Sequence, residues 1–189
     1  MAHRVCPWWI GHLLASPLRR LIQRPEEILG SLAGAGMTVL EPGPGMGFFT
    51  LELARLVGPQ GRVVAVDLEP RMLAGLKRRA VKAGLAERIE LREARVNSLE
   101  VGDLAGTVDF VLAFAMVHEM PSAEAFFAET ALALKPGGRM LFAEPAGHVK
   151  PADFERELAC AARAGFRVTG RPAVRRSLAA VLTLGAAEG

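Results

Sequence analysis

Short apolar runs alternate with longer segments of helical spacing from about Met37 to near the end of the chain. The runs of consecutive apolar or β-branched residues predict strands over residues 37–41, 62–67, 89–91, 108–113 and 140–144. Helical spacing of apolar residues predicts helices over residues 48–57, 70–83, 122–134 and 151–164. Residues 166–169 and 177–184 predict a closing pair of strands. This alternation is typical of an α/β fold in which helices cover both faces of a parallel sheet.

Residues that begin and end helices support these boundaries. Pro70 and Pro151 stand in first helical turns, where proline is tolerated. Ser122 is expected to cap one helix at its start, and Gly84 and residues 136–138 are expected to end two others. In doubly wound sheets, ligands bind outside the carboxyl ends of the strands. The residues that end the strands are therefore the candidates for a functional site.

The first two predicted strands carry the strongest local pattern. The first ends at Glu41 and runs into a loop with glycines at alternate positions, Gly43, Gly45 and Gly47. Glycine lets a backbone turn tightly and lets a ligand lie against it. The second strand ends at Asp67, about twenty residues further on, where a carboxylate can accept hydrogen bonds from adjacent ribose hydroxyls. The pattern predicts a nucleoside-containing ligand.

The glycine spacing argues against a nicotinamide dinucleotide. That fingerprint needs glycine or alanine at its last position, whereas Phe48 or Thr50 stands there in this chain, depending on the glycine from which one counts. A nicotinamide-dependent oxidoreductase therefore ranks last among the functions considered.

An acid followed by three alternate glycines resembles the first motif of the class I S-adenosylmethionine (SAM)-dependent methyltransferases, in particular those of the small-molecule type. Further similarity to this family, in the family's order, covers residues 64–73, 108–111, 134–141 and 165–166. The resemblance implies a Rossmann-like, doubly wound α/β sheet of seven strands in the order 3-2-1-4-5-7-6, with strand 7 antiparallel and helices on both faces. It also implies SAM as cofactor.

The resemblance implies a role for each matching residue. Glu41 would lie near the methionine amino group, and Gly43, Gly45 and Gly47 would approach the methionine and ribose. Asp67 would bind the ribose hydroxyls. Leu68 would pack on the adenine, and Val96 would contact it as well. One departure concerns the adenine amino group, because Arg95 aligns with the acid that often accepts its hydrogen bond, and arginine has no acceptor.

The chemistry of methyl transfer requires alignment of donor and acceptor, and a base only if the acceptor must lose a proton. His118 and Glu119 follow the fourth predicted strand, and Glu144 ends the fifth, with His148 close behind. We predict His118 as base or substrate contact, with Glu119 orienting it and Glu144 facing the acceptor. The alternative is that His118 packs under its loop and Glu119 caps the next helix.

Several related chemistries find no support in the sequence. The chain contains no tyrosine and no Asn-Pro-Pro-Tyr motif, and no Pro-Cys nucleophile follows the fourth strand. Its two cysteines, Cys6 and Cys160, argue against arsenite as a substrate, which several thiolates would hold. We expect no metal, since His3, Cys6 and His12 lack a fourth ligand.

The composition and length fit one domain. The 189 residues are 51% hydrophobic and 23% charged, and the formal net charge is +3, which permits but does not demand nucleic-acid binding. We expect no membrane span and no signal peptide. The two distant cysteines favour a cytoplasmic location. Residues 1–36 are interpreted as a helical lead-in or cap, with Trp8 and Trp9 over the site or against another subunit, and residues 37–189 as the SAM-binding domain.

The favoured function is methyl transfer from SAM to a small-molecule acceptor. The alternatives are an RNA or protein methyltransferase that uses its basic residues, among them Arg19, Arg20, Arg171, Arg175 and Arg176, and a non-catalytic SAM-binding module. A homodimer is possible, because the N-terminal apolar residues can pack against a partner subunit.

Overall fold

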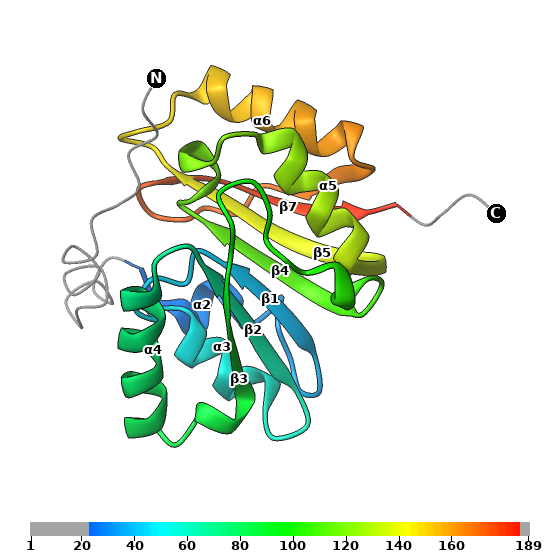
Figure 1. The fold of residues 1–189 in the computed structure, drawn as a ribbon. Helices are drawn as coiled ribbons and strands as arrows, with labels where there is room; N and C mark the ends of the chain where they lie inside the picture. Colours follow the sequence, from blue (N-terminus) through cyan, green and yellow to red (C-terminus); the bar gives the residue numbers. More distant parts are fainter. Residues whose placement is uncertain (1–22, 186–189) are drawn as a thin grey trace. The chain divides into compact units, whose positions relative to one another are not determined.

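A computed structural model describes residues 23–185, which form two compact units divided between Ala94 and Arg95 (Figure 1). The predicted roles of several N-terminal residues lie outside the described residues: His3, Cys6, Trp8, Trp9, His12, Arg19 and Arg20. The seven strands follow the order β3-β2-β1-β4-β5-β7-β6, and β7 is antiparallel to β5 and β6. The predicted Rossmann-like α/β fold is thereby confirmed.

The first unit alternates strands and helices as the apolar pattern predicts. Its elements are α2 (Pro25–Leu29), β1 (Thr38–Pro42), α3 (Thr50–Val57), β2 (Arg62–Asp67), α4 (Pro70–Lys82), the 3-10 turn η2 (Ala86–Arg88) and β3 (Ile89–Glu93). Strand β2 pairs in parallel with β1 and with β3. Residues 63–66 of β2 are all buried, as expected of a parallel strand covered on both faces.

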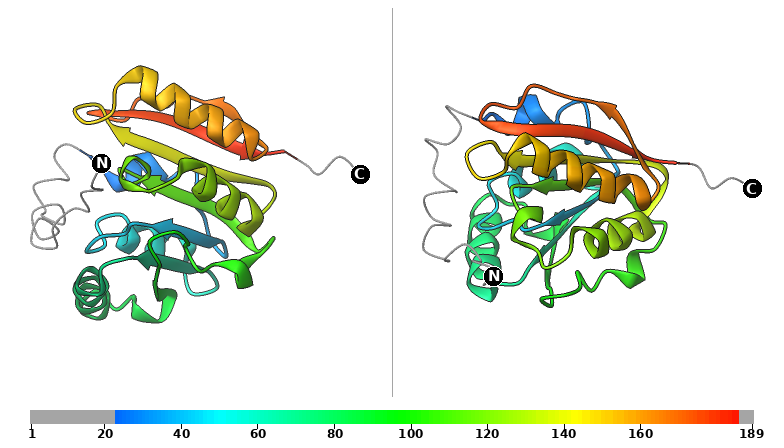
Figure 2. Two further views of the ribbon diagram at one scale, coloured as in Figure 1. Left: turned by 45° about the horizontal axis from the view of Figure 1, so that its top comes forward. Right: turned by 90° about the horizontal axis from the view of Figure 1, so that it is seen from above.

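The second unit holds the remaining four strands and two long helices. Its elements are the 3-10 turn η3 (Gly102–Leu104), β4 (Val108–Phe114), the 3-10 turn η4 (Val117–Glu119), α5 (Ala123–Ala133), β5 (Leu134–Pro145), α6 (Pro151–Arg163), β6 (Phe166–Gly170) and β7 (Ser177–Leu184). Ser122 caps α5 as predicted, because its hydroxyl accepts a hydrogen bond from the Ala125 N–H at 3.1 Å. Helices α5 and α6 pack against each other (Figure 2).

One strand boundary differs from the prediction. Strand β5 begins at Leu134, not near Met140, and pairs with β4 first at Val108 and again from Phe110, which faces Arg139. The residues between form an irregularity in the ladder, with Gly137 at φ +76°. The glycines that predict a turn therefore lie inside β5. The left-handed backbone conformation of Gly137 accommodates the additional residues of β5 as an irregularity of the bulge type.

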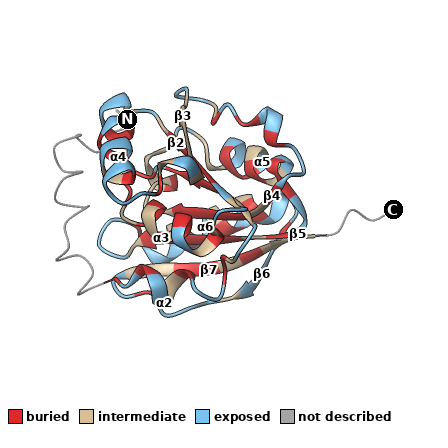
Figure 3. Cartoon of the chain, turned by 90° about the horizontal axis from the view of Figure 1, so that it is seen from below, coloured by how far each residue is buried: buried red, intermediate tan, exposed pale blue. Residues whose placement is uncertain are grey.

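Aromatic side chains fill the core of the second unit. Phe127 of α5 meets Phe142 of β5 edge to face, with ring centroids 5.4 Å apart, and Phe142 stacks on Phe154 of α6 at 4.9 Å. Phe166 adds a further edge contact to Phe127 at 6.1 Å. Figure 3 shows the buried residues of the strands in red. This packing holds β5 and α6 firmly and fixes the side chains at their ends.

Candidate functional site

The glycine loop follows β1 in the first unit and turns sharply at three points. Gly43, Gly45 and Gly47 have φ angles of +66°, +55° and +82°, which other residues rarely adopt. The Gly43 N–H donates to the Val66 carbonyl at 2.9 Å, and the Gly47 N–H donates to the Pro44 carbonyl at 3.0 Å. The backbone of the loop is thus tied to β2 and closed upon itself.

Asp67 lies at the end of β2 and contacts this loop directly. One carboxylate oxygen accepts a hydrogen bond from the Gly45 N–H at 3.2 Å, and the other accepts one from the Glu69 N–H at 2.9 Å. Burial raises the pKa of Asp67 to about 6, although these backbone hydrogen bonds favour the charged form. Carboxylate oxygens have lone pairs for further donors. The structure therefore brings Asp67 and the glycine loop together.

The space around the loop fits a ligand lying against it. A Cβ atom built on Gly45 would meet no heavy atom of residues 23–185 within 4 Å, so these residues leave the backbone there open to an approaching group. Leu68, the next residue after Asp67, has 40% of its surface exposed and can offer an apolar surface. Glu41 is buried within β1. These residues suit an uncharged ribose and adenine, with one acid nearby for a cation.

Arg79 of α4 is a loop contact that the sequence did not reveal. Arg71, near the start of α4, is exposed. Arg79, by contrast, is partly buried, and its guanidinium donates a hydrogen bond to the Met46 carbonyl in the glycine loop. Helical phase was the available signal, because Arg79 lies seven residues after buried Met72 and three after buried Leu76.

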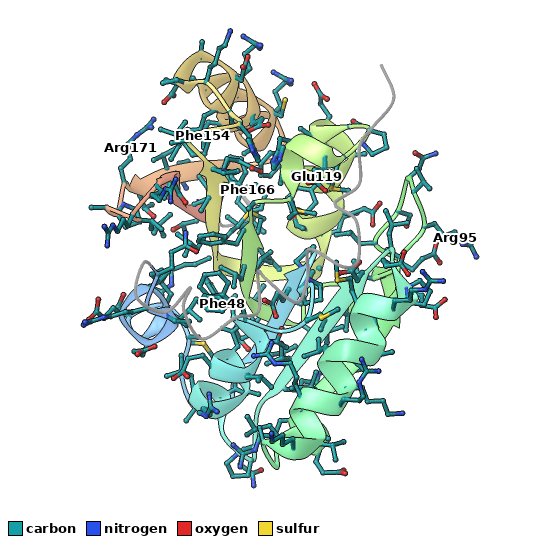
Figure 4. The ribbon with its side chains drawn as sticks, turned by 90° about the vertical axis from the view of Figure 1, so that its left-hand side faces the viewer. Phe48, Arg95, Glu119, Phe154, Phe166 and Arg171 are labelled. Carbon is teal, nitrogen blue, oxygen red and sulfur yellow. The ribbon has the colours of Figure 1, made fainter. Side chains whose placement is uncertain are left out.

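Arg95 and Val96 belong to the second unit and form an exposed turn. The Arg95 side chain, labelled in Figure 4, is 80% exposed and lies 3.4 Å from a carboxylate oxygen of Glu100. Val96 is 60% exposed. Arg95 and Ser98 bond to each other through their backbones.

The predicted catalytic residues meet at one end of the second unit. Glu144 is completely buried at the end of β5, and one of its oxygens accepts hydrogen bonds from the N–H groups of Val117 and His118, at 2.8 and 3.3 Å. The other oxygen lies 2.5 Å from Nδ1 of His118. This carboxylate therefore fixes both the backbone and the imidazole ring of η4, and it directs the His118 Nε2 atom away from itself.

The charges around His118 favour its protonated form. The hydrogen bond that His118 donates to Glu144 is the main cause that raises the pKa of His118, and burial opposes it. Glu119, labelled in Figure 4, has a carboxylate oxygen 3.9 Å from His118 Nε2. Since Ser122 caps α5, the structure does not use Glu119 as that cap. His148 lies close as well, with its ring centroid 6.1 Å from that of His118.

Glu157 of α6 is a further member of this cluster that the sequence analysis missed. Burial and the charge of Glu144 raise the pKa of Glu157 to about 7, while His118 lowers it. Its Oε2 atom is buried and has no hydrogen-bond partner among the described residues. The signal was a carboxylate on the face of α6 that also carries buried Phe154, Leu158 and Ala161.

Within residues 23–185, no three histidine, cysteine or acidic side chains are grouped so that they could hold a metal ion. In the same part of the chain, every helix is too short or too polar to cross a bilayer.

Comparisons with known proteins agree with this geometry. A family model described as a methyltransferase domain matches residues 39–138. An arsenite methyltransferase from Halobacterium salinarum is 34% identical over 109 residues, which cover 58% of this chain and 27% of the relative. A ubiquinone biosynthesis O-methyltransferase from Xanthomonas axonopodis is 31% identical over 134 residues. These residues cover 70% of this chain and 54% of the relative. The chain thus spans about half or less of the length of these relatives.

A solved structure extends the likeness over nearly the whole chain. The crystal structure of a SAM-dependent methyltransferase from Aquifex aeolicus superimposes with a TM-score of 0.83 at 25% sequence identity, covering 95% of this chain and 98% of that one. The glycine loop bonded to Asp67, the strand order and the family match together lead to one conclusion: the chain belongs to the methyltransferase domain family and has the class I SAM-dependent methyltransferase fold.

Proposed function

We propose that this protein transfers a methyl group from SAM to a small-molecule acceptor. The observation that carries the proposal is the hydrogen bond between Gly45 and Asp67, beside a loop surface that is open at Gly45. A carboxylate at a strand end next to a bare glycine backbone suits a ribose with a group extending along the loop. SAM, when bound, supplies a methyl group already activated by its positive sulfur.

Each cofactor residue has a distinct task in this proposal. Asp67 accepts hydrogen bonds from the ribose hydroxyls, and Leu68 covers one adenine face. Gly43, Gly45 and Gly47 allow the methionine and ribose to approach the backbone, and Glu41 offsets the positive charge of the methionine amino group. We also propose Val96 as an apolar contact to adenine, made by packing alone, because Arg95 has no acceptor for the amino group.

We propose that the acceptor carries an O–H or N–H group and that His118 takes its proton. Glu144 fixes Nδ1 of His118, so Nε2 is the nitrogen left to act as base. Glu144 also stabilises the imidazolium that forms, and Glu119, 3.9 Å from Nε2, helps to orient the ring. This arrangement of carboxylate and imidazole resembles that of enzymes in which a carboxylate orients a histidine base. The ubiquinone biosynthesis relative, an O-methyltransferase, supports an oxygen acceptor.

Arsenite is not proposed as the acceptor, although one relative is an arsenite methyltransferase. Thiolates bind metals and metalloids, whereas burial raises the pKa of Cys160, and this thiol lies beside the Glu124 carboxylate. The second cysteine, Cys6, lies outside the described residues. One protonated thiol does not make a site for arsenic.

An RNA acceptor is less well supported than a small molecule. Arg171, one of the arginines considered for RNA binding, forms two hydrogen bonds to the Glu155 carboxylate, at 2.8 and 3.1 Å. A guanidinium held in this way must break an existing pair before it can bind a phosphate. A cytoplasmic location, a homodimer and a capping role for residues 1–36 remain proposals as well.

Calorimetry with SAM and with NAD tests the cofactor assignment. We expect SAM to bind and NAD to bind more weakly or not at all. Incubation with methyl-labelled SAM and a panel of phenols and amines then tests transfer, and a His118→Ala variant tests the base. Absence of SAM binding, or tighter NAD binding, would refute the cofactor. SAM binding without transfer to any acceptor would favour the non-catalytic module instead.

A further inference from the structure

Helix α4 contacts the glycine loop at three positions, Gly75, Leu76 and Arg79. A Cβ atom built on Gly75 would lie 3.0 Å from Cγ of Met46, so the Met46 side chain rests closely on the helix there. A Cβ atom built on Gly47 would lie 2.3 Å from Leu76 Cδ1. Arg79, one turn further along, donates its hydrogen bond to the Met46 carbonyl. Packing and hydrogen bonding thus act on the same short segment.

The Arg79 contact differs in kind from the other two. Apolar packing fixes the position of Met46 but leaves the orientation of its peptide group undefined. A charged guanidinium bonded to the carbonyl fixes that orientation, because such hydrogen bonds are stronger than neutral ones. On the other side of Met46, the Gly45 N–H is bonded to Asp67. The backbone from Gly45 to Gly47 is therefore held from α4 and from β2 at once.

Such anchoring affects binding because the loop is rich in glycine, which has high conformational freedom. Three glycines in five residues lose much conformational entropy when they become ordered. A loop that is ordered before the ligand arrives does not lose that entropy on binding, so affinity increases.

We propose that Arg79 is a positioning residue for SAM, which holds the glycine loop in its binding conformation through the Met46 carbonyl. This inference rests on the proposed function, since it assigns Arg79 to the SAM site. Arg79 acts through the loop backbone and need not touch the cofactor. It therefore differs from Asp67, which is proposed to contact the ribose itself.

The adjacent residue offers a matched control. Arg78 has the same side chain and the same place near the end of α4, but it is exposed. Arg78→Ala and Arg79→Ala change net charge and helix propensity equally. Only Arg79→Ala removes the hydrogen bond to the loop. Arg79→Lys retains one cationic donor and should rescue part of the effect.

Two measurements on the full chain test the proposal. By calorimetry, Arg79→Ala should weaken SAM binding about tenfold, Arg79→Lys by less, and Arg78→Ala by no more than about twofold. By NMR hydrogen exchange without ligand, the Gly47 and Gly45 amides should exchange faster in Arg79→Ala than in Arg78→Ala. Thermal unfolding of each variant shows whether the fold is retained. If Arg79→Ala does not fold, the same two measurements are made on Arg79→Lys instead.

Each outcome decides a separate question. Equal SAM affinity of the Arg78 and Arg79 variants, or equal exchange of their loop amides, would overturn the role of Arg79. If the unaltered protein bound no SAM, the proposed function would fail instead. The exchange measurement would still show whether Arg79 orders the loop.

Discussion

At the scale of single residues, Asp67 is a carboxylate whose burial disfavours the charge that its proposed role in ribose binding requires. Burial disfavours its charge, whereas two backbone N–H groups and, in our proposal, two ribose hydroxyls favour it. The protein tolerates the cost of a buried carboxylate at the point where a ligand would stabilise it. Such perturbed groups are frequent at functional sites.

Replacing Asp67 by alanine should weaken SAM binding by about 1–3 kcal/mol, because hydrogen bonds to a charged group are lost. Calorimetry measures this loss directly. Asp109→Ala is the control, since it removes a carboxylate of the second unit that pairs with Lys135 and leaves the loop intact. Unchanged affinity in Asp67→Ala would contradict the assigned role.

SAM affinity should also depend on pH near the Asp67 pKa of about 6. The ribose hydroxyls donate to the ionised carboxylate, so binding competes with protonation. Affinity should be constant above this pKa and fall by up to tenfold per pH unit below it. Calorimetry between pH 5 and pH 8 tests this, and the fall should be absent in Asp67→Ala. A pH-independent affinity in the unaltered protein would show that Asp67 is not the acceptor.

The titration of His118 tests the geometry of the second cluster without any acceptor. Because the hydrogen bond to Glu144 favours the imidazolium, NMR should show a midpoint above the ordinary histidine pKa of about 6.5. The hydrogen bond between His118 and Glu144 stabilises the fold fully at pH values below the ordinary histidine pKa. This stabilisation is lost as the pH rises through the raised pKa of His118 in the folded protein. Glu144→Gln should lower the midpoint. A midpoint at or below 6.5 in the unaltered protein would argue against the pair.

At the scale of elements, the glycine loop connects to the end of one strand, to helix α4 and to the Asp67 carboxylate. Its glycines serve different purposes, although all three have positive φ angles. Gly47 faces Leu76 of α4 and has no room for a side chain, whereas no atom of the described residues lies within 4 Å of a Cβ built on Gly45. Stability should therefore depend more on Gly47, and ligand binding more on Gly45.

Alanine substitutions at these glycines should separate the two effects. Gly47→Ala should cost the most stability, because the backbone penalty of about 1–2 kcal/mol is joined by overpacking against Leu76. Gly45→Ala should cost only the backbone penalty and yet weaken SAM binding. Gly84→Ala, at φ +67° and also facing open space, is the control for that penalty. Denaturant unfolding and calorimetry measure both quantities, and equal SAM affinity in Gly45→Ala and Gly84→Ala would contradict the proposed approach.

At the scale of the whole molecule, the two units carry different parts of the proposed activity. The first holds the glycine loop and Asp67, and the second holds the cluster of His118, Glu144 and Glu157. The aromatic core belongs to the second unit. Each unit thus positions its own candidate site residues by contacts within that unit.

Ligand binding should be visible in the unfolding of the entire chain. SAM at about one hundred times its dissociation constant should add about 2.7 kcal/mol to the free energy of unfolding, because it binds only the folded state. Differential scanning calorimetry should show a higher midpoint with SAM and no change with NAD. The same SAM concentration should raise the unfolding midpoint of Asp67→Ala by less than that of the unaltered protein, because the variant has the larger dissociation constant. No shift in the unaltered protein would oppose a specific site.

The sequence by itself determined the features that depend on local pattern. Periodicity predicted the seven strands and the four α-helices between them, since apolar runs and helical spacing reflect which face is buried. The glycine loop and Asp67 were found because each ends a strand, and the ends of neighbouring parallel strands lie together. The early start of β5 was missed, because pairing with β4 overrides the turn preference of its glycines.

Only the tertiary structure decided which distant side chains meet. Arg79 lies 33 residues from Met46, and Glu144 lies 26 residues from His118, separations that no periodic pattern connects. Arg78 and Arg79 are the same residue type, and they differ in the direction in which their positions on α4 point their side chains. Glu157 is one carboxylate among many until α6 packs it near His118 and Glu144. Local preferences specify the elements, but hydrogen bonds and burial between elements depend on how they pack.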